Sequence, residues 1–170
     1  VLPQLIERCG RTATGSITGF YTVLVEGDDI NEPVSDAMRG FLDGHLALSR
    51  NLAGKGHYPA IDILDSISRV MPDIVDKKHL EKARQLRRLL AIYRDIEDLV
   101  NIGAYTAGNN PEYDLAIAAY PRINAFLCQN IDEPVSFQDA CGAMDALLGQ
   151  IRDGIKTSRR GDGAAGPMAE

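Results

Sequence analysis

Several motifs that would identify a chemistry are missing from this 170-residue sequence. Its three cysteines are widely spaced and contain no C-x-x-C pair, which argues against a disulfide framework or a zinc site and favours reduced thiols. Its three histidines lack H-x-x-x-H spacing, so we predict no metal ligands. No apolar run reaches the about 18 residues of a membrane span. A phosphate-binding loop of the form G-x-x-x-x-G-K-[ST] is also absent.

The charge balance argues against one class of partner. The net charge is −6 and the isoelectric point is near 5.1, whereas nucleic-acid sites need a basic face. A hydrophobic content of 45% is ordinary for a globular protein, and the composition is typical of a cytosolic one. The chain begins at Val1 rather than at methionine and continues directly into apolar periodicity, so we expect it to be part of a longer polypeptide.

The first region, residues 1–72, has the pattern of an α/β unit. Residues 17–25 are rich in β-formers at both odd and even positions, and successive residues of a strand point to opposite faces. This pattern predicts a strand covered on both faces. Pro33 follows a polar residue and should begin a helix. Residues 45–49 form a short apolar run, predicted as a strand, and a short helix should precede Gly54. This alternation predicts crossover units in a parallel sheet.

Residues 73–155 have helical periodicity throughout. Apolar residues recur every three or four positions from Leu80 to Val100, which predicts one long amphipathic helix. Asn110-Pro111 should start a second helix, which Pro121 should kink or divide. The residues from Ser136 to Asp139 resemble a capping box that opens a third helix. Residues 156–170 are glycine-rich and charged, and we predict a disordered tail.

Two positions in the first region could carry chemistry. Proline holds Tyr58 in Tyr58-Pro59 in an extended conformation, so its ring could serve as a stacking platform for a base; the alternative is a partly buried structural tyrosine. Arg69 stands on an apolar segment and could reach a phosphate; the alternative is a salt bridge to Asp62 or Asp65.

An acidic cluster follows the predicted strand. Paired carboxylates can bind Mg²⁺ or perform acid–base catalysis, but a solvated loop beside a turn glycine is the favoured interpretation. The cluster consists of Glu26, Asp28, Asp29 and Glu32.

Five segments together resemble the ATPases of flagellar and type III secretion export, which are relatives of the rotary ATP synthases. The resemblance runs from Leu2 to about Leu148. It implies the C-terminal end of a RecA-like ATPase domain with a parallel sheet (1–72), followed by an all-helical bundle domain (73–155). The segments are 15–29, 42–45, 48–50, 56–71 and 100–105.

The resemblance also implies residue roles. Tyr58 and Pro59 would pack on adenine, and Phe126 would approach the other face, although a core phenylalanine remains the alternative. Ile131 stands where rotary synthases carry a second phenylalanine. Arg69, in Ser-x-Ser-Arg, would be an arginine finger that reaches a nucleotide held by the neighbouring subunit, which implies a ring.

The family's activity sets the functional expectation. The parent would hydrolyse ATP with Mg²⁺ as a homohexamer and couple hydrolysis to chaperone release and substrate unfolding at the export gate. The water-activating glutamate and the magnesium-binding aspartate would precede Val1, so this chain alone should be inactive and require no cofactor. Expected partners are a coiled-coil stalk protein, export chaperone–substrate complexes and the gate, at the cytoplasmic face of the export apparatus and peripheral to the membrane.

Two other interpretations stay open. The helical region could be a non-catalytic docking module for a stalk or chaperone protein, or the chain could come from a rotary ATP synthase subunit. The loop 106–111 replaces the acidic lever motif of the synthase catalytic subunits, which favours the export branch, and within it a flagellar system over an injectisome. A mixed charged face on the long helix would suit an acidic stalk helix or simply face solvent. Its members are Lys77, Lys78, Glu81, Arg84, Arg87, Arg88 and Arg94.

Overall fold

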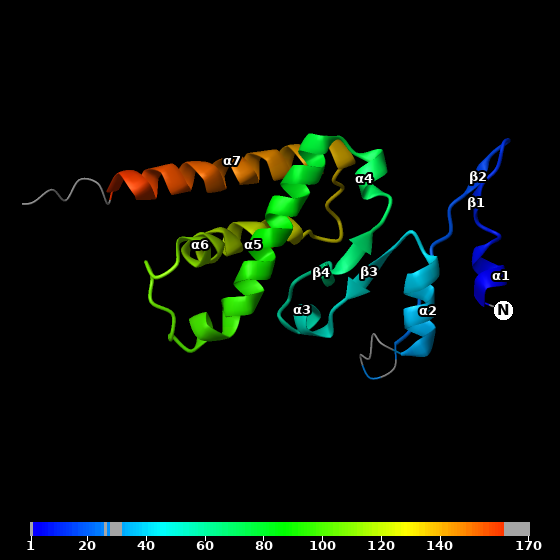
Figure 1. Cartoon of the computed structure of the whole chain (residues 1–170), viewed down its shortest axis with the longest axis horizontal. Coiled ribbons are helices and arrows are strands. Elements are labelled where there is room, and N and C mark those ends of the chain that lie inside the picture. The colour runs from blue at the N-terminus through cyan, green and yellow to red at the C-terminus, as the bar shows by residue number, and fades with distance from the viewer. Residues whose placement is uncertain (1, 26, 28–31, 162–170) are drawn as a thin grey trace, which may run out of the picture.

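The computed structural model describes residues 2–25, 27 and 32–161, and within these ranges it describes side chains from residue 3 to residue 154 (Figure 1). A small α/β region occupies the N-terminal side, and three long helices form the other side. This division agrees with the predicted fold class of an α/β unit followed by a helical bundle. None of the described helices is both long and apolar enough to cross a membrane.

The N-terminal segment contains a short helix and a small hairpin. Helix α1 (Leu2–Ile6) leads into β1 (Gly10–Arg11), which pairs antiparallel with β2 (Ser16–Ile17). The strand predicted over 17–25 is therefore limited to its first residue. A strand needs a neighbour for its backbone donors and acceptors, and the described chain supplies only the short β1. Phe20 is accordingly 96% exposed and Leu24 91% exposed.

The second strand pair forms the centre of the α/β region. Helix α2 (Pro33–Phe41) begins at its proline as predicted, and β3 (Gly44–Leu48) follows. Helix α3 (Arg50–Gly54), capped by the Ser49 side chain, leads to β4 (Ile61–Ser68).

The pairing of β3 and β4 is antiparallel, so the predicted parallel crossover is not found in the described residues. A parallel return needs a long connection that crosses the sheet, and the five-residue α3 is too short. The strands approach closely at Gly44, where a Cβ atom would lie 2.5 Å from the Ile67 carbonyl oxygen.

Two of the three long C-terminal helices, α6 and α7, begin where the sequence predicts, and the Asp76 cap of α5 is an addition from the structure. After α4 (Met71–Ile74), Asp76 caps α5 (Lys77–Asn101), and Asn110 caps α6 (Pro111–Leu127). Ser136 Oγ accepts a hydrogen bond from the Asp139 N–H at 3.1 Å at the start of α7 (Phe137–Gly161). Helix α7 includes residues 156–161, so the predicted disorder is wrong for them, and residues 162–170 of the predicted tail lie outside the description.

Helix α6 continues through Pro121, so of the predicted kink or division the division is wrong. The proline lies on the exposed side of α6, while Ala119 and Ile123 on either side of it are buried. Core packing thus holds the turns before and after the missing N–H in register.

The hydrophobic core lies between α5, α6 and α7. Ile123 of α6 is 1% exposed and belongs to one cluster of eight buried residues, with Phe126 among the half-buried residues at the margin of the cluster. Burying such side chains is the main stabilising contribution to a helical bundle. The cluster comprises Leu86, Leu89, Ala119, Ile123, Met144, Leu147, Leu148 and Ile151.

Candidate functional site

The predicted adenine platform is an exposed ring at the loop before β4. The Tyr58 side chain is 57% exposed, and the Tyr58–Pro59 peptide bond is cis. More than half of this tyrosine is thus exposed, which leaves its role as an adenine platform or as a partly buried structural residue a prediction. Because the ring face is open, it can accept a planar base by stacking.

The loop that carries Tyr58 is tied to the end of α6. The Gln129 backbone N–H donates to the Tyr58 carbonyl oxygen at 2.9 Å. His57 is buried, and its Nδ1 lies 2.8 Å from Asn124 Oδ1 and 3.4 Å from Cys128 Sγ. These contacts bring residues 57–58 to the segment that contains Phe126. Phe126 packs against the bundle core and remains half-buried, so it has a core contact whether or not it also meets a ligand.

Arg69 lies directly after β4, and its guanidinium is exposed. Its two terminal nitrogens donate to the Arg39 and Gly40 carbonyl oxygens, at 2.9 and 3.2 Å. These carbonyls stand in the last turn of α2, where the helix dipole favours a cation. The alternative salt bridge to Asp62 or Asp65 is not formed.

The carboxylates of Asp62 and Asp65 face α5 instead. Arg94 Nη1 lies 3.2 Å from Asp65 Oδ1 and 3.9 Å from Asp62 Oδ1. Arg87 donates to the Ser66 and Leu64 carbonyl oxygens at 2.9 and 3.1 Å. Both arginines thus clamp α5 to β4.

Within the predicted mixed charged face, Arg87 is therefore held against β4, whereas the Arg94 side chain also pairs with β4 but stays 51% exposed. A helical period places residues on one side of a helix but does not reveal that a strand covers that side. Arg88 does lie on the exposed side, where it pairs with Glu112 at 2.7 Å.

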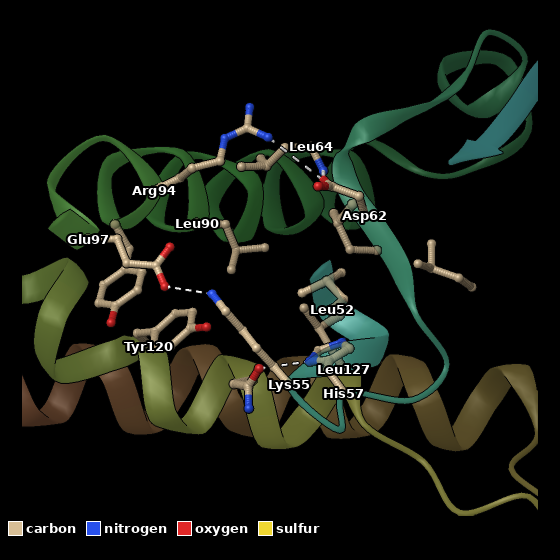
Figure 2. A pocket seen from close by; sticks show the side chains of 14 residues that line it. Leu52, Lys55, His57, Asp62, Leu64, Leu90, Arg94, Glu97, Tyr120 and Leu127 are labelled. Carbon is tan, nitrogen blue, oxygen red and sulfur yellow. Dashed lines mark hydrogen bonds and ion pairs between the residues drawn. The ribbon is translucent and has the colours of Figure 1, made fainter. Parts of the chain in front are cut away.

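A pocket of about 110 Å³ lies at the joint between the two regions (Figure 2). Lys55 spans it and pairs with Glu97 at 3.0 Å, and this hydrogen bond raises the pKa of Lys55. The Tyr93 and Tyr120 rings stack with centroids 3.6 Å apart, and burial raises the pKa of both phenols. Ligand pockets usually measure about 300–1,000 Å³, so this volume is too small for a nucleotide.

Sequence reasoning missed this joint. Lys55 and Glu97 are separated by 42 residues, and nothing in their local patterns links them. Tyr93 was recognised only as a member of an apolar helical face. Neither Tyr58 nor Phe126 lines the pocket, but His57 and Asn124 do, so the pocket lies beside the predicted adenine platform and does not include its rings.

The described residues fit the adenine end of a nucleotide but not its metal-bound phosphates. The exposed Tyr58 ring offers a stacking face, whereas nowhere in residues 2–25, 27 and 32–154 do three His, Cys, Asp or Glu side chains gather to hold a metal ion. Most of the acidic cluster, Glu26, Asp28 and Asp29, lies outside the description; Glu32 stands at the start of α2 without a side-chain capping bond.

Comparison with known families divides the chain into two parts. Residues 1–68 match the nucleotide-binding domain of the ATP synthase alpha/beta family. Residues 75–146 match the family described as the T3SS EscN ATPase C-terminal domain. The first match contains Tyr58 and ends one residue before Arg69, and the second contains Phe126.

Individual relatives agree with this division. The flagellum-specific ATP synthase of Bacillus subtilis is 51% identical over 149 residues, which cover 88% of this chain and 34% of the relative. The assembled ATPase EscN of the enteropathogenic E. coli type III secretion system superposes with a TM-score of 0.82 at 42% identity, over 86% of this chain and 36% of EscN. EscN in complex with its central stalk EscO gives a TM-score of 0.77 at 40% identity, over 86% and 35%. This chain thus spans about a third of the length of the relatives it matches.

Proposed function

The chain belongs to the family of flagellar and type III secretion ATPases, and from that premise we propose that it forms the C-terminal part of a Mg²⁺-dependent, protein-exporting ATPase. The observation that carries the proposal is the placement of Tyr58 and Arg69 at opposite ends of β4. One strand presents an exposed aromatic ring before it and an exposed guanidinium after it.

In the proposed mechanism, these residues serve two different nucleotides. Tyr58, with Pro59 and Phe126, contacts adenine in its own subunit. Arg69 stabilises the charge on the γ-phosphate held by the neighbouring subunit of a homohexameric ring, which would require its guanidinium to leave or share the α2 carbonyls. Bound Mg²⁺ would neutralise phosphate charge during transfer, and residues upstream of this chain would hold it.

The proposal extends to cellular partners and location. Hydrolysis would drive chaperone release and substrate unfolding at the export gate, on the cytoplasmic side of the membrane. A coiled-coil stalk protein would contact the helical region; the complex of the relative EscN with its central stalk EscO supports this part. The 51% identity to a flagellar relative supports a flagellar export system. The superposition on EscN, with a TM-score of 0.82, supports an injectisome in the same way.

A non-catalytic docking module is the second candidate, and one observation favours it. The helical region buries a core made from its own residues, so it could fold and bind a partner without nucleotide. A rotary synthase origin is less well supported, because residues 75–146 match the type III secretion C-terminal domain.

Phosphate release from two polypeptides separates the candidates. The full-length protein should hydrolyse ATP in the presence of Mg²⁺, and this 170-residue chain alone should not. No turnover by the full-length protein under any condition that assembles it would favour the docking module. Steady turnover by the chain alone, abolished by Arg69→Ala, would contradict the proposed division of roles.

A further inference from the structure

We propose that His57 is a positioning residue for adenine recognition: its buried imidazole holds the Tyr58 ring at a set distance from Phe126. The inference rests on the proposed function, because it assumes that Tyr58 stacks on adenine. It concerns a side chain that touches neither nucleotide nor the reacting atoms.

The hydrogen-bond chemistry assigns a direction to the His57 contact. Asn124 Oδ1 carries no hydrogen, so at the 2.8 Å contact His57 Nδ1–H must donate. Cys128 Sγ, 3.4 Å from the same nitrogen, is a second and weaker partner. His57 is 8% exposed, so water does not readily replace either partner.

Figure 2 shows the His57 side chain in this contact, and the sequence places the contact beside both proposed adenine residues. Asn124 and Cys128 lie two residues before and two residues after Phe126, at the end of α6. His57 is adjacent to Tyr58. The imidazole therefore joins the backbone of the platform to the turn that carries the second ring.

Few other contacts hold the platform. Tyr58 is 57% exposed, so packing fixes the position of its ring only in part. Its carbonyl accepts one hydrogen bond from Gln129 N–H, which alone leaves the loop free to pivot. The His57 N–H bond to the Leu52 carbonyl, at 3.0 Å, ties the same residue to the end of α3. Loss of the imidazole contact should thus shift Tyr58 relative to Phe126 without removing either ring.

The test is an equilibrium titration of the full-length protein with a fluorescent adenine nucleotide that cannot be hydrolysed. His57→Leu should weaken binding about 3- to 10-fold, the effect of losing one buried hydrogen bond that orients the site. His57→Asn should recover most of this loss, because its carboxamide nitrogen lies near the Nδ1 position and can donate to Asn124. If the role of His57 were merely structural, two variants with the same loss of thermal stability would have the same nucleotide affinity. His57→Asn would then recover affinity only as far as it recovers stability.

The second readout is whether the affinity losses of His57→Leu and Tyr58→Ala add in the double variant. In a Tyr58→Ala background, His57→Leu should change affinity less than about 2-fold, because there is no longer a ring to position. Additive losses would overturn the positioning role.

A matched control exists elsewhere in the bundle. His79 Nδ1 lies 3.7 Å from Cys141 Sγ, a similar pair far along the chain from Tyr58. His79→Leu should leave nucleotide affinity unchanged. Equal loss of affinity in His79→Leu and His57→Leu would overturn the inference.

Failure of the proposed function gives a different result. If Tyr58→Ala leaves affinity unchanged, then the adenine platform is wrong and the role of His57 falls with it. If Tyr58→Ala weakens binding and His57→Leu does not, only the positioning inference is wrong.

Discussion

The helical region and the α/β region differ in how they bury apolar side chains. In the helical region, Ile96 is 2% exposed and Ile123 is 1% exposed, and residues from all three long helices share one core. In the α/β region, Met38 is the one large apolar side chain that is buried among the described residues, whereas Leu48 is 77% exposed. The bundle therefore supplies its own core, and we propose that the rest of the nucleotide-binding domain covers the α/β region in the longer protein.

The joint between these regions differs from both. Guanidinium bonds from α5 to β4, the Lys55–Glu97 pair and the His57–Asn124 bond connect them. Hydrogen bonds and ion pairs are directional, and their rearrangement exposes little apolar surface. This joint can therefore set the orientation of the two regions while each region keeps its own packing. Stability should thus depend on the bundle, and chemistry on the α/β region.

The largest expected effect concerns the chemistry of the α/β region. In the full-length protein, Arg69→Ala should lower ATP turnover by about 10³-fold or more and leave nucleotide affinity nearly unchanged, because a finger acts on the transition state. Arg88→Ala, which removes an exposed arginine of the bundle, is the control.

Mixed assemblies test whether Arg69 acts between subunits. Arg69→Ala subunits combined with phosphate-loop mutants should recover part of the activity. Absence of rescue at every mixing ratio would show that Arg69 serves only to cap α2.

A core substitution tests the self-sufficiency of the bundle. Ile123→Ala should lower the free energy of unfolding by about 2–5 kcal/mol, through lost burial and the cavity left behind. Ile131→Ala is the matched control; its side chain is 99% exposed and its change should stay within about 0.5 kcal/mol. Urea unfolding followed by circular dichroism measures both. Equal effects would mean that the core does not dominate the stability of this region.

The next largest effect is expected on ATP affinity, from substitutions of Tyr58 in the adenine platform. Tyr58→Ala should weaken ATP binding by about 1–3 kcal/mol if stacking is its main role. Tyr58→Phe should be nearly silent, because the ring face is used and not the hydroxyl. Calorimetric titration of the full-length protein would measure both affinities, and equal damage from the two substitutions would argue against stacking.

The stability of the joint should depend on Arg87 and not on the adjacent Arg88. Arg87→Ala should cost about 1–3 kcal/mol of stability, because it leaves the Leu64 and Ser66 carbonyls without their charged donor. Arg88→Ala should cost less than about 1 kcal/mol, as exposed ion pairs usually do. Hydrogen exchange of β4 amides would locate the effect, and equal protection in both variants would contradict the clamp.

Arg88, unlike Arg87, can test the expected binding of a stalk protein to α5. Reversal of Arg88 to Glu tests whether the exposed face of α5 attracts an acidic partner helix, most visibly at low salt. Reversal of Arg87 would instead disrupt the joint, so it cannot serve as a test of the surface.

The smallest expected effect is a pH dependence at the start of α5. The Asp76 carboxylate accepts the His79 backbone N–H at 2.7 Å, which lowers the pKa of this carboxyl. A lowered folded-state pKa means that the cap stabilises the helix above the ordinary carboxyl pKa and is lost as pH falls through the folded value. Asp76→Asn should accept the same bond at every pH, so acid titration by circular dichroism should show a weaker dependence in the variant.

Local signals predicted most of the helices. The proline that starts α2, the Asn110 and Ser136 caps and the apolar period of α5 each act within a few residues of where they stand. Long-range pairing was predicted less well. The strand over 17–25 and the parallel crossovers were wrong for the described residues, because strand formation depends on a distant neighbour that periodicity does not specify.

For the candidate site, the sequence by itself determined which residues are chemically suitable: Tyr58 beside a proline, Arg69 after a strand, and a family resemblance covering both. Only the tertiary structure decided their surroundings. It placed Asp62 and Asp65 opposite Arg94, directed Arg69 to the carbonyls of α2, and buried His57 between the platform and Asn124. The physical reason is that a side chain's chemistry belongs to its residue, whereas its partners are chosen by packing between segments that are far apart in the chain.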